Sequence, residues 1–497
     1  MTATLDPRTP IVIGVGVAHQ RSANIDDSLE TIALIELAAR RAAADTGVFD
    51  VAALLRSTDL ISIPKGIWSY TDPGRMVASR IHAGSARSAL FELGVLQTSI
   101  FRHGFEAILN GDADVVIIAG GEAKYRALQA AIAGIAAPES SSPTDPPDIV
   151  VTPDHDIVHE IEVQRGLRVP ARQYAIIDSA LRYAKRQSVT EHTALLAELW
   201  SSFSAVAVDN PDAWNRDFAS AETMRGSTTN TMLAFPYTKL HCSQWNVDQS
   251  AAFIVCSYER AIELGVGSDR FVFPRAIVES NYMAPLVRRA EMHRSPAVAR
   301  VGASLADALQ RPLDSVEVLD LYSCFPAAVR MQIEEFGITT EAHNALTITG
   351  GMTFGGGPLN NYTFQSIAKL CSQLRTQTGA VGIATAVSGI LTKFGASAWS
   401  CSLPVDDIAL IEVTDNVAAA TALVDVDATF AGVGTIAGYT VEHDNGTPVQ
   451  TIAIIDTPSG ARSVATSSDT SIMKSCMLEE WIGRSVSVLG PTFTHET

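Results

Sequence analysis

Apolar segments and amphipathic helical patterns alternate along the first 125 residues. Mainly apolar runs lie at residues 11–17, interrupted by Gly14 and Gly16, at 60–63 and at 115–119, and apolar residues at helical spacing follow Ile25 and cover about 98–110. Runs of this length are typical of strands buried on both faces. Because strands that alternate with helices form parallel sheets, this part of the chain is predicted to be α/β.

A second series of the same kind begins near Phe271. It predicts strands at 271–278, 316–321 and 380–387, helices at 296–309, 326–336 and 362–375, and an edge hairpin through 397–402 and 408–413. The series parallels the order of elements in residues 10–125. The chain is therefore predicted to contain an internal duplication of about 120 residues.

Two further units differ in composition. Residues 137–155 contain five prolines among Ser and Asp, which break regular structure, and 156–233 has a mainly helical pattern. From residue 428, β-formers alternate with polar residues around the turns Asp444-Asn445-Gly446 and Pro458-Ser459-Gly460, which predicts a small OB-like β-barrel of about five or six strands. We therefore divide the chain into residues 1–125, a loop domain at 126–235, residues 236–413 and a β-barrel domain at 428–497.

Charge and composition exclude several classes of function. With 497 residues, 47% of them hydrophobic, and a net charge of −18, the chain is globular and acidic, without a Lys/Arg stripe for nucleic acid. It has no charged leader followed by an apolar stretch and no apolar run of membrane-spanning length, which predicts a cytoplasmic protein. Its six cysteines include no CxxC pair, so we expect reduced thiols and no metal site.

Four short motifs follow one another along the two series. They are Asn110-Gly111-Asp112-Ala113 leading to Gly120-Gly121; Asn246 through Ala252; Asp320-Leu321-Tyr322-Ser323-Cys324-Phe325; and Gly350-Gly351-Met352-Thr353-Phe354-Gly355-Gly356-Gly357-Pro358 together with 382–389. Each motif alone is weak evidence, whereas four in a fixed order form a specific signature.

In order and spacing these motifs resemble those of the thiolase superfamily over roughly residues 8–413. The sequence is most similar to actinobacterial thiolase-like proteins, often labelled acetyl-CoA acetyltransferases and related to sterol-carrier-type thiolases, that carry an extra C-terminal β-domain. The resemblance implies an α/β thiolase fold: two βαβαβαββ repeats in a five-layer αβαβα arrangement, with a helical loop insertion. It also implies acyl-CoA thioesters as ligands or substrates, lipid metabolism as the setting, and no bound cofactor.

The residues of the thiolase reaction are missing. That reaction needs a thiolate nucleophile at a helix N-terminus, a second Cys and a His. The nucleophile position falls at about 94–96, but the first 241 residues contain no cysteine. By resemblance the histidine maps to Gly357 and the second cysteine to Val387. We therefore expect neither condensation nor thiolysis of acetyl-CoA or acetoacetyl-CoA.

Two kinds of group remain that chemistry could use. Backbone N–H groups near Gly94 and Val95 and at Gly389 could form an oxyanion hole, because that device depends on chain path. Tyr322 and Cys324 follow a predicted strand at the end where α/β sheets place their sites, and a phenol there could transfer a proton. Against this, a cysteine in this place is commonly a small core residue, and a buried tyrosine often only hydrogen-bonds a carbonyl.

Other residues have competing explanations. Thr98 and Ser99 are expected to bond backbone rather than act as nucleophiles, and Asn360, Asn361 and Tyr362 to cap the next helix. Gly355, Gly356 and Gly357 either approach a bound acyl group or pack against the protein. We discount a His241–Cys242 pair, because neighbours on a strand point to opposite faces.

Two hypotheses follow. In the first, the protein is an acyltransferase-type enzyme or C–C lyase that acts on CoA thioesters without covalent acyl transfer, using Tyr322. In the second, it is a non-catalytic acyl-CoA-binding or scaffold protein. Any ligand should lie between the carboxyl ends of the two repeats' strands, where a bulky residue at Gly357 should abolish binding at little cost in stability. The resemblance allows a homodimer, and the added domain and the irregular loop segment leave a monomer open as well.

Overall fold

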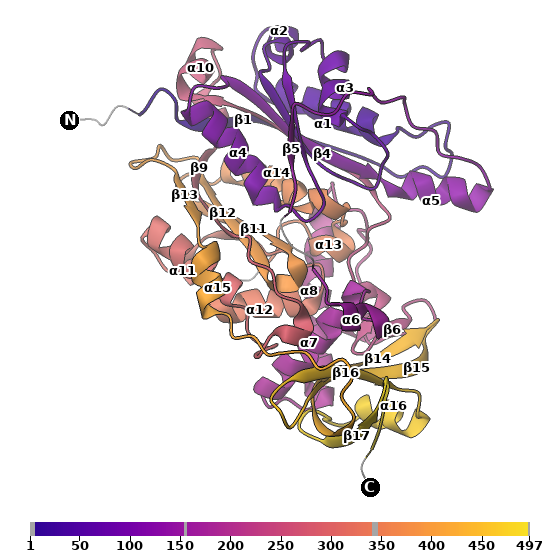
Figure 1. The fold of residues 1–497 in the computed structure, drawn as a ribbon. Coiled ribbons are helices and arrows are strands. Elements are labelled where there is room, and N and C mark those ends of the chain that lie inside the picture. Colours follow the sequence, from indigo (N-terminus) through magenta and orange to yellow (C-terminus); the bar gives the residue numbers. More distant parts are fainter. Residues whose placement is uncertain (1–4, 154–156, 340–345, 496–497) are drawn as a thin grey trace.

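Two stacked α/β halves and a β-barrel make up the molecule (Figure 1). The structure is a computed structural model that describes residues 5–153, 157–339 and 346–495. The first sheet has the order β1-β8-β4-β2-β3-β5 and the second β10-β11-β12-β9-β13. The strands of the first are β1 (Pro10–Gln20), β2 (Leu60–Pro64), β3 (Arg87–Phe91), β4 (Val115–Ala123), β5 (Ile149–Val151) and β8 (Asp248–Ser257). Those of the second are β9 (Phe273–Ser280), β10 (Val318–Asp320), β11 (Val381–Ser388), β12 (Lys393–Ser400) and β13 (Ala409–Glu412).

The two sheets repeat one topology. In the first, β1 pairs with β8 and β8 with β4, both antiparallel, and β4 pairs with β2 in parallel. In the second, β9 pairs with β12 and β12 with β11, both antiparallel, and β11 pairs with β10 in parallel. This shared strand order agrees with the internal duplication predicted from the sequence.

Helices form the layers between and outside the sheets. The helices α4 (Gln97–Leu109) and α14 (Tyr362–Leu374) lie between the sheets. Phe101 on α4 contacts Phe253 of β8, Phe364 of α14 and Trp399 of β12, with ring centroids 4.9–5.4 Å apart. One aromatic side chain thus joins both sheets through the central layer. The outer faces are covered by α1 (Thr31–Asp45) and α3 (Pro73–Arg80) on the first sheet and by α11 (Pro296–Leu309) and α12 (Pro326–Phe336) on the second.

The insertion between the halves is helical, as expected. Its long helices are α7 (Pro170–Ala184) and α8 (Val189–Asp209), with the short α6 (Glu160–Gln164) and α9 (Ala221–Met224). Ser188 and Glu191 form a capping box at the start of α8. The remaining helices are α2 (Val51–Arg56), α5 (Lys124–Ala133), α10 (Tyr258–Glu263), α13 (Gly351–Phe354) and α15 (Thr414–Ala420).

Five C-terminal strands close into a ring. They are β14 (Gly432–Asp444), β15 (Thr447–Asp456), β16 (Arg462–Ser467), β17 (Ser485–Leu489) and β18 (Thr492–His495), with α16 (Thr470–Cys476) between β16 and β17. The ring runs β14-β15-β16-β18-β17 and returns to β14. Outside it, β6 (Met232–Ala234) and β7 (Tyr237–Thr238) extend the sheet from β14. The ring is the C-terminal barrel that the alternating pattern predicted.

Two local expectations are wrong. β12 and β13 do not form a hairpin, because β9 lies between them and pairs with β13 in parallel. Asn361 precedes α14 but makes no side-chain cap hydrogen bond. β8, which follows the predicted boundary at 235/236, pairs with β1 and β4 of the first sheet.

Candidate functional site

The turn between β3 and α4 holds the first predicted site residues. Gly94 has a left-handed φ of +98°, and a Cβ there would lie 3.2 Å from Pro153, so the segment after β5 covers this turn. The Val95 N–H donates to the Glu92 carbonyl oxygen at 3.1 Å. In this conformation Val95 therefore has no free N–H to offer to an oxyanion, contrary to the expectation from the sequence.

Gln97 is the first residue of α4 and directly follows residues 94–96, where the sequence places the nucleophile position of the thiolase reaction. It is 3% exposed, its Nε2 donates to Asn360 Oδ1 at 2.5 Å, and its Oε1 accepts from the Thr363 hydroxyl at 3.3 Å. An amide cannot act as the nucleophile of acyl transfer. Instead, Gln97 ties the N-terminus of α4 to the N-terminus of α14.

The hydroxyls of Thr98 and Ser99 also form hydrogen bonds within the protein. They donate to Glu279 Oε2 at 3.0 and 2.9 Å, and Glu279 is 3% exposed at the end of β9. Burial raises the pKa of Glu279, and these two hydrogen bonds oppose the rise. The expectation that these hydroxyls bond backbone is therefore wrong: both donate to a side-chain carboxylate and connect the start of α4 to the end of β9.

Tyr322 and Cys324 lie between β10 and α12. The Tyr322 N–H donates to Thr385 Oγ1 of β11 at 2.7 Å, and its ring meets that of Tyr362 edge-on at 5.5 Å. No hydrogen bond of its hydroxyl to another described residue is found. Burial, with a smaller effect of Cys324, raises its pKa. The phenol therefore stays protonated at neutral pH and could donate a proton but not accept one.

The thiols near this turn are inert. Burial raises the pKa of Cys324 to about 12, and burial followed by the proximity of Cys324 does the same for Cys242. At pH 7 only about one such thiol in 10⁵ is ionised, and the thiolate is the reactive form. Cys324 is thus a buried core residue, the alternative to a nucleophile that the sequence left open.

The three glycines at 355–357 pack against protein atoms. A Cβ on Gly355 would lie 2.8 Å from the carbonyl oxygens of Gly351 and Thr349, and one on Gly356 2.1 Å from Gln249 Oε1. At Gly357 it would lie 2.2 Å from Ser243 Oγ. These contacts favour internal packing over approach to a ligand at all three positions.

Most of the predicted residues nevertheless converge. The Ser243 N–H donates to the Cys324 carbonyl oxygen at 3.1 Å, and the Gly357 N–H to that of Gln244 at 2.9 Å. The strand-to-helix turn at 322–325 and the glycine segment therefore flank the same short stretch of chain. Gly389 lies apart from these residues: a Cβ there would lie 2.8 Å from Met283 Sδ and 3.0 Å from Thr392 Oγ1.

A buried polar network that the sequence did not reveal orders this region. Asp320 Oδ1 accepts from the hydroxyls of Thr347 and Thr349 and from the Ile348 N–H, at 2.6–3.1 Å. The Tyr362 hydroxyl donates to Asp320 Oδ2 at 3.0 Å. The network joins the end of β10 to the glycine segment and α14. Because its members lie up to 42 residues apart, no local pattern could have indicated it.

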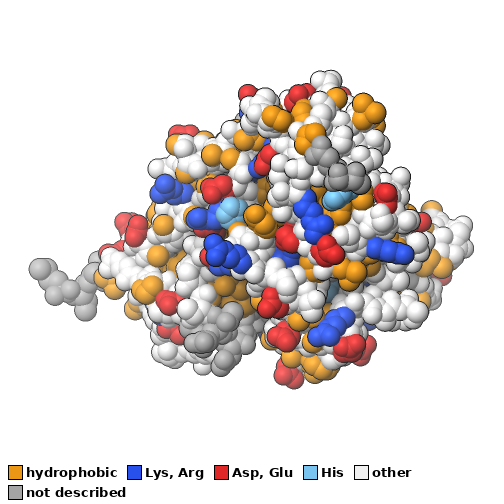
Figure 2. All heavy atoms as spheres, turned by 90° about the horizontal axis from the view of Figure 1, so that it is seen from below, with side chains coloured by type: hydrophobic (Ala, Val, Ile, Leu, Met, Phe, Trp, Pro, Cys, Tyr) orange, Lys and Arg blue, Asp and Glu red, His pale blue; other side chains and the backbone are white. Residues whose placement is uncertain are grey.

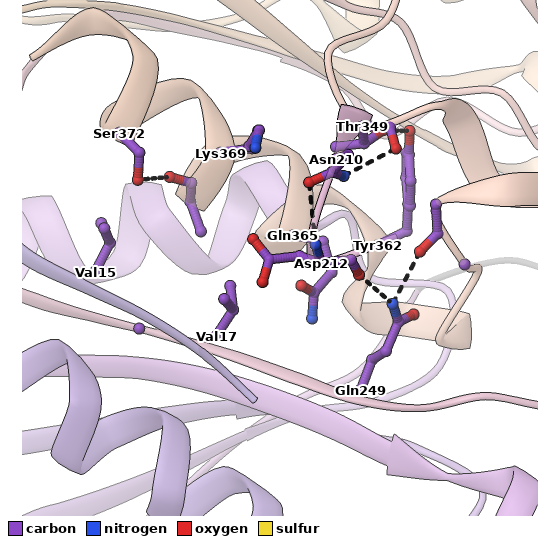
Figure 3. Close-up of a pocket in the computed structure, with 14 residues that line it drawn as sticks. Val15, Val17, Asn210, Asp212, Gln249, Thr349, Tyr362, Gln365, Lys369 and Ser372 are labelled. Carbon is purple, nitrogen blue, oxygen red and sulfur yellow. Dashed lines mark hydrogen bonds between the residues drawn. The ribbon is translucent and has the colours of Figure 1, made fainter. Parts of the chain in front are cut away.

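A cavity of about 140 Å³ opens beside this network (Figure 3). It lies between α14 and β1 and is also bordered by residues 210–212 and by Gly355 and Gly356. Figure 3 shows Gln249 bound to two backbone carbonyl groups at its edge. Tyr322, Cys324 and Gly389 are not among its lining residues. The cavity is thus separate from the turn that carries Tyr322.

His241 and Cys242 do not form a pair. His241 Nδ1 lies 2.9 Å from the Thr238 hydroxyl, whereas the Cys242 thiol donates to the Thr238 carbonyl oxygen at 3.4 Å. The expectation is confirmed, although His241 ends a 3₁₀ turn and is not on a strand. Within the described residues no group of three or more His, Cys, Asp or Glu side chains could hold a metal ion.

The surface carries charges of both signs. Figure 2 shows the end of the molecule with the barrel, where basic side chains lie among acidic ones. None of the described helices combines the length and the apolar composition needed to cross a bilayer.

Comparisons with known proteins show which proteins this chain is similar to. Residues 412–490 match the family of the thiolase-like protein type 1 additional C-terminal domain. No curated protein matches the chain. The crystal structure of a monomeric SCP2-thiolase like protein type 1 from Mycobacterium smegmatis is 26% identical, with a TM-score of 0.83, and the alignment covers 99% of this chain and 100% of that one.

Other solved structures share the α/β halves. The Ltp2–ChsH2 (DUF35) aldolase is 18% identical over 79% of this chain and 98% of that one, with a TM-score of 0.59. Human mitochondrial 3-ketoacyl-CoA thiolase in complex with CoA is 15% identical over 79% and 97%, with a TM-score of 0.55. The chain therefore has the thiolase fold, is similar over its whole length to an SCP2-thiolase like protein of type 1, and carries a C-terminal region that matches the additional C-terminal domain of the type 1 thiolase-like proteins.

Proposed function

We propose that the protein binds an acyl-CoA thioester between its two halves without forming an acyl-enzyme, and so without thiolase turnover. The observation that carries the proposal is the start of α4: residues 94–96, where acyl transfer would need a nucleophile, are Gly, Val and Leu, and Gln97 after them is held by Asn360 and Thr363. Both nearby thiols have a pKa of about 12, so neither replaces the missing thiolate.

The arrangement of helices supports a thioester ligand. The 13-residue helices α4 and α14 start next to each other, since Gln97 at the start of one contacts Asn360 just before the other. Helix N-termini present unpaired N–H groups and partial positive charge, which favour a carbonyl or carboxylate oxygen. A CoA complex of a protein with this fold adds general support.

Titration calorimetry with acetyl-CoA, acetoacetyl-CoA and free CoA tests the proposal. We expect saturable binding of the thioesters. Intact-mass spectra of the same mixtures should show only the unmodified chain. An added acyl mass would overturn the non-covalent mechanism, and no binding at millimolar thioester would overturn the ligand class.

A second candidate is C–C bond cleavage in a β-hydroxyacyl-CoA. The observation in its favour is the Tyr322 phenol, which lies at the carboxyl end of β10 without a hydrogen bond to another described residue. In a retro-aldol step a base removes the hydroxyl proton, the Cα–Cβ bond breaks, and the acyl-CoA enolate takes a proton at carbon. Tyr322 is protonated at neutral pH, so its phenol could supply that last proton, and the phenolate would regain one from the base that took the hydroxyl proton.

Product analysis with β-hydroxyacyl-CoA thioesters separates the two candidates. Formation of a shortened acyl-CoA and a carbonyl product, lost in Tyr322→Phe and kept in Tyr183→Phe, would favour cleavage. Tyr183 is 49% exposed on α7 and serves as the matched control. Binding without product in the wild type would leave the non-catalytic function.

A further inference from the structure

The turn after β11 has a backbone conformation that side-chain-bearing residues rarely adopt. Gly389, Ile390 and Leu391 have consecutive left-handed φ values of +55°, +51° and +68°. Glycine tolerates this region, whereas a β-branched residue such as Ile390 is strained there. Such a conformation persists only where the surrounding structure imposes it.

Arg289 supplies that constraint from inside the protein. It is 6% exposed, and its guanidinium donates to the carbonyl oxygens of Ala284 at 3.0 Å, Ile390 at 2.6 Å and Gly389 at 3.1 Å. The Ser295 hydroxyl donates to the Leu391 carbonyl oxygen at 2.7 Å. Every carbonyl group of the turn is therefore held by a buried donor. Burial lowers the pKa of Arg289 to about 10, which leaves it charged at neutral pH.

The C-terminal barrel in turn holds the chain at Arg289. Arg462 of β16 is 5% exposed and donates from Nη1 to the Arg289 carbonyl oxygen and from Nη2 to that of Ala290, the latter at 2.8 Å. Its own N–H donates to Asp425 O at 2.8 Å. Leu423, in the chain between α15 and β14, forms an isolated antiparallel β-bridge with Arg289. The barrel and the chain just before it thus hold the backbone of Arg289, and the Arg289 side chain holds the Gly389–Leu391 turn.

We infer that Arg462 and Arg289 form a two-arginine clamp through which the barrel positions the Gly389–Leu391 turn. Arg462 and Arg289 are positioning residues: Arg462 fixes the backbone of Arg289, and Arg289 fixes the carbonyl groups of the turn. If the Gly389–Leu391 turn borders the acyl-CoA site, as the sequence predicts for Gly389, the barrel supports that border through the clamp. This last step rests on the proposed function, whereas the clamp itself does not.

Hydrogen exchange of the full-length chain tests the clamp without any ligand. The Thr392 N–H donates to Gly389 O at 3.2 Å, so its exchange reports whether the turn is closed. In Arg462→Gln we expect this amide to exchange about tenfold faster, because two charge-assisted bonds that hold the Arg289 backbone are lost. Arg462→Lys keeps the positive charge but loses the planar guanidinium that donates to two carbonyl oxygens at once. We therefore expect the same faster exchange of the Thr392 amide in this variant.

Arg172→Gln is the matched control. Arg172 joins α7 to Glu442 of the barrel, so its loss weakens another barrel contact without touching the clamp. Faster exchange at Thr392 in both Arg462 variants and not in the control supports the inference. Unchanged exchange in a folded Arg462→Gln overturns it, and if that variant does not fold, Arg462→Lys decides by the same readout. If acyl-CoA binding is absent in the wild type, the proposed function fails while the exchange result still decides the clamp.

Discussion

At the scale of single residues, the two buried histidines His192 and His241 are held neutral. Burial lowers the pKa of His192 and of His241 to about 4, against 6.5 for an exposed histidine. His192 Nδ1 also lies 3.2 Å from the Arg330 guanidinium, whose charge opposes protonation. Asp178, 3.6 Å from His192 Nε2, acts in the other direction but does not offset burial.

These histidines should make stability depend on pH below neutrality. Between pH 6.5 and 4 the unfolded chain binds protons that the folded chain excludes, so the free energy of unfolding falls as pH falls through this window. The loss is at most about 3 kcal/mol for each histidine. Urea unfolding at pH 7 and pH 5 measures it. His192→Gln should flatten the dependence, whereas His19→Gln, at an exposed site, should not. Equal slopes in all three proteins would contradict the assignment.

Gly357 is a second residue whose substitution should change stability. A Cβ there would lie 2.2 Å from Ser243 Oγ and 3.3 Å from the Met352 carbonyl oxygen. We expect Gly357→Val to lower the free energy of unfolding by about 1–3 kcal/mol, as overpacking does elsewhere. The geometry thus argues against the expectation that a bulky residue here costs little stability.

Gly84 provides the matched control for this substitution. No atom lies within 4 Å of a Cβ built on Gly84. Gly84→Val should therefore change stability by less than about 0.5 kcal/mol. Denaturant titration of both variants checks the pair, and a Gly357→Val protein as stable as the wild type would show that Ser243 and its neighbours yield easily.

The sequence could indicate which residue types were missing, but not which side chains replaced them. The absence of cysteine before residue 242 was visible directly. Gln97 was not, because its role depends on Asn360 and Thr363, more than 260 residues away. The Val95 N–H was expected to be free, but it donates to the Glu92 carbonyl oxygen. The residue types at 92–95 did not indicate this backbone hydrogen bond.

At the scale of elements, apolar patterns predicted most helices and strands because each buried element carries its own periodicity. Helices α11 and α12 begin and end at the residues predicted. Pairing between strands was less accessible. β13 pairs with β9, about 130 residues earlier in the chain, and β8 joins the first sheet across the insertion. Nothing in a strand's own composition identifies such a partner.

One element affects association between molecules. β5 pairs in parallel with β3 along Ala89–Phe91 and so covers what would otherwise be a free edge of the first sheet. β5 itself has only three residues, and short edge strands pair poorly with other chains.

We therefore predict that the protein is a monomer. Light scattering after size-exclusion chromatography at micromolar concentration should give the mass of one chain. The mass of two chains would mean that another surface mediates association. The related protein of Mycobacterium smegmatis is also described as monomeric.

At the scale of the whole molecule, the duplicated α/β core was predictable and the attachment of the barrel was not. The turn residues at 444–446 and 458–460 predicted two β-hairpins of the barrel, which are β14–β15 and β15–β16. Besides apolar packing of Ile452, Ile454 and Val464, its contacts include single charged side chains, such as Arg182 with Glu480 and Arg462 with the Arg289 backbone. These side chains have no distinguishing sequence context. The order of motifs identified the superfamily, whereas the packing around them decided what chemistry remains.

Intact-mass analysis of the protein saturated with acetoacetyl-CoA tests the central claim most directly. The claim is that this thiolase fold binds a thioester without a covalent step. After calorimetry has established saturation, denaturing spectra should contain only the mass of the unmodified chain, because Gln97 stands at the helix start and the nearby thiols are not ionised. A species heavier by one acyl group, formed in proportion to bound thioester, would contradict the account.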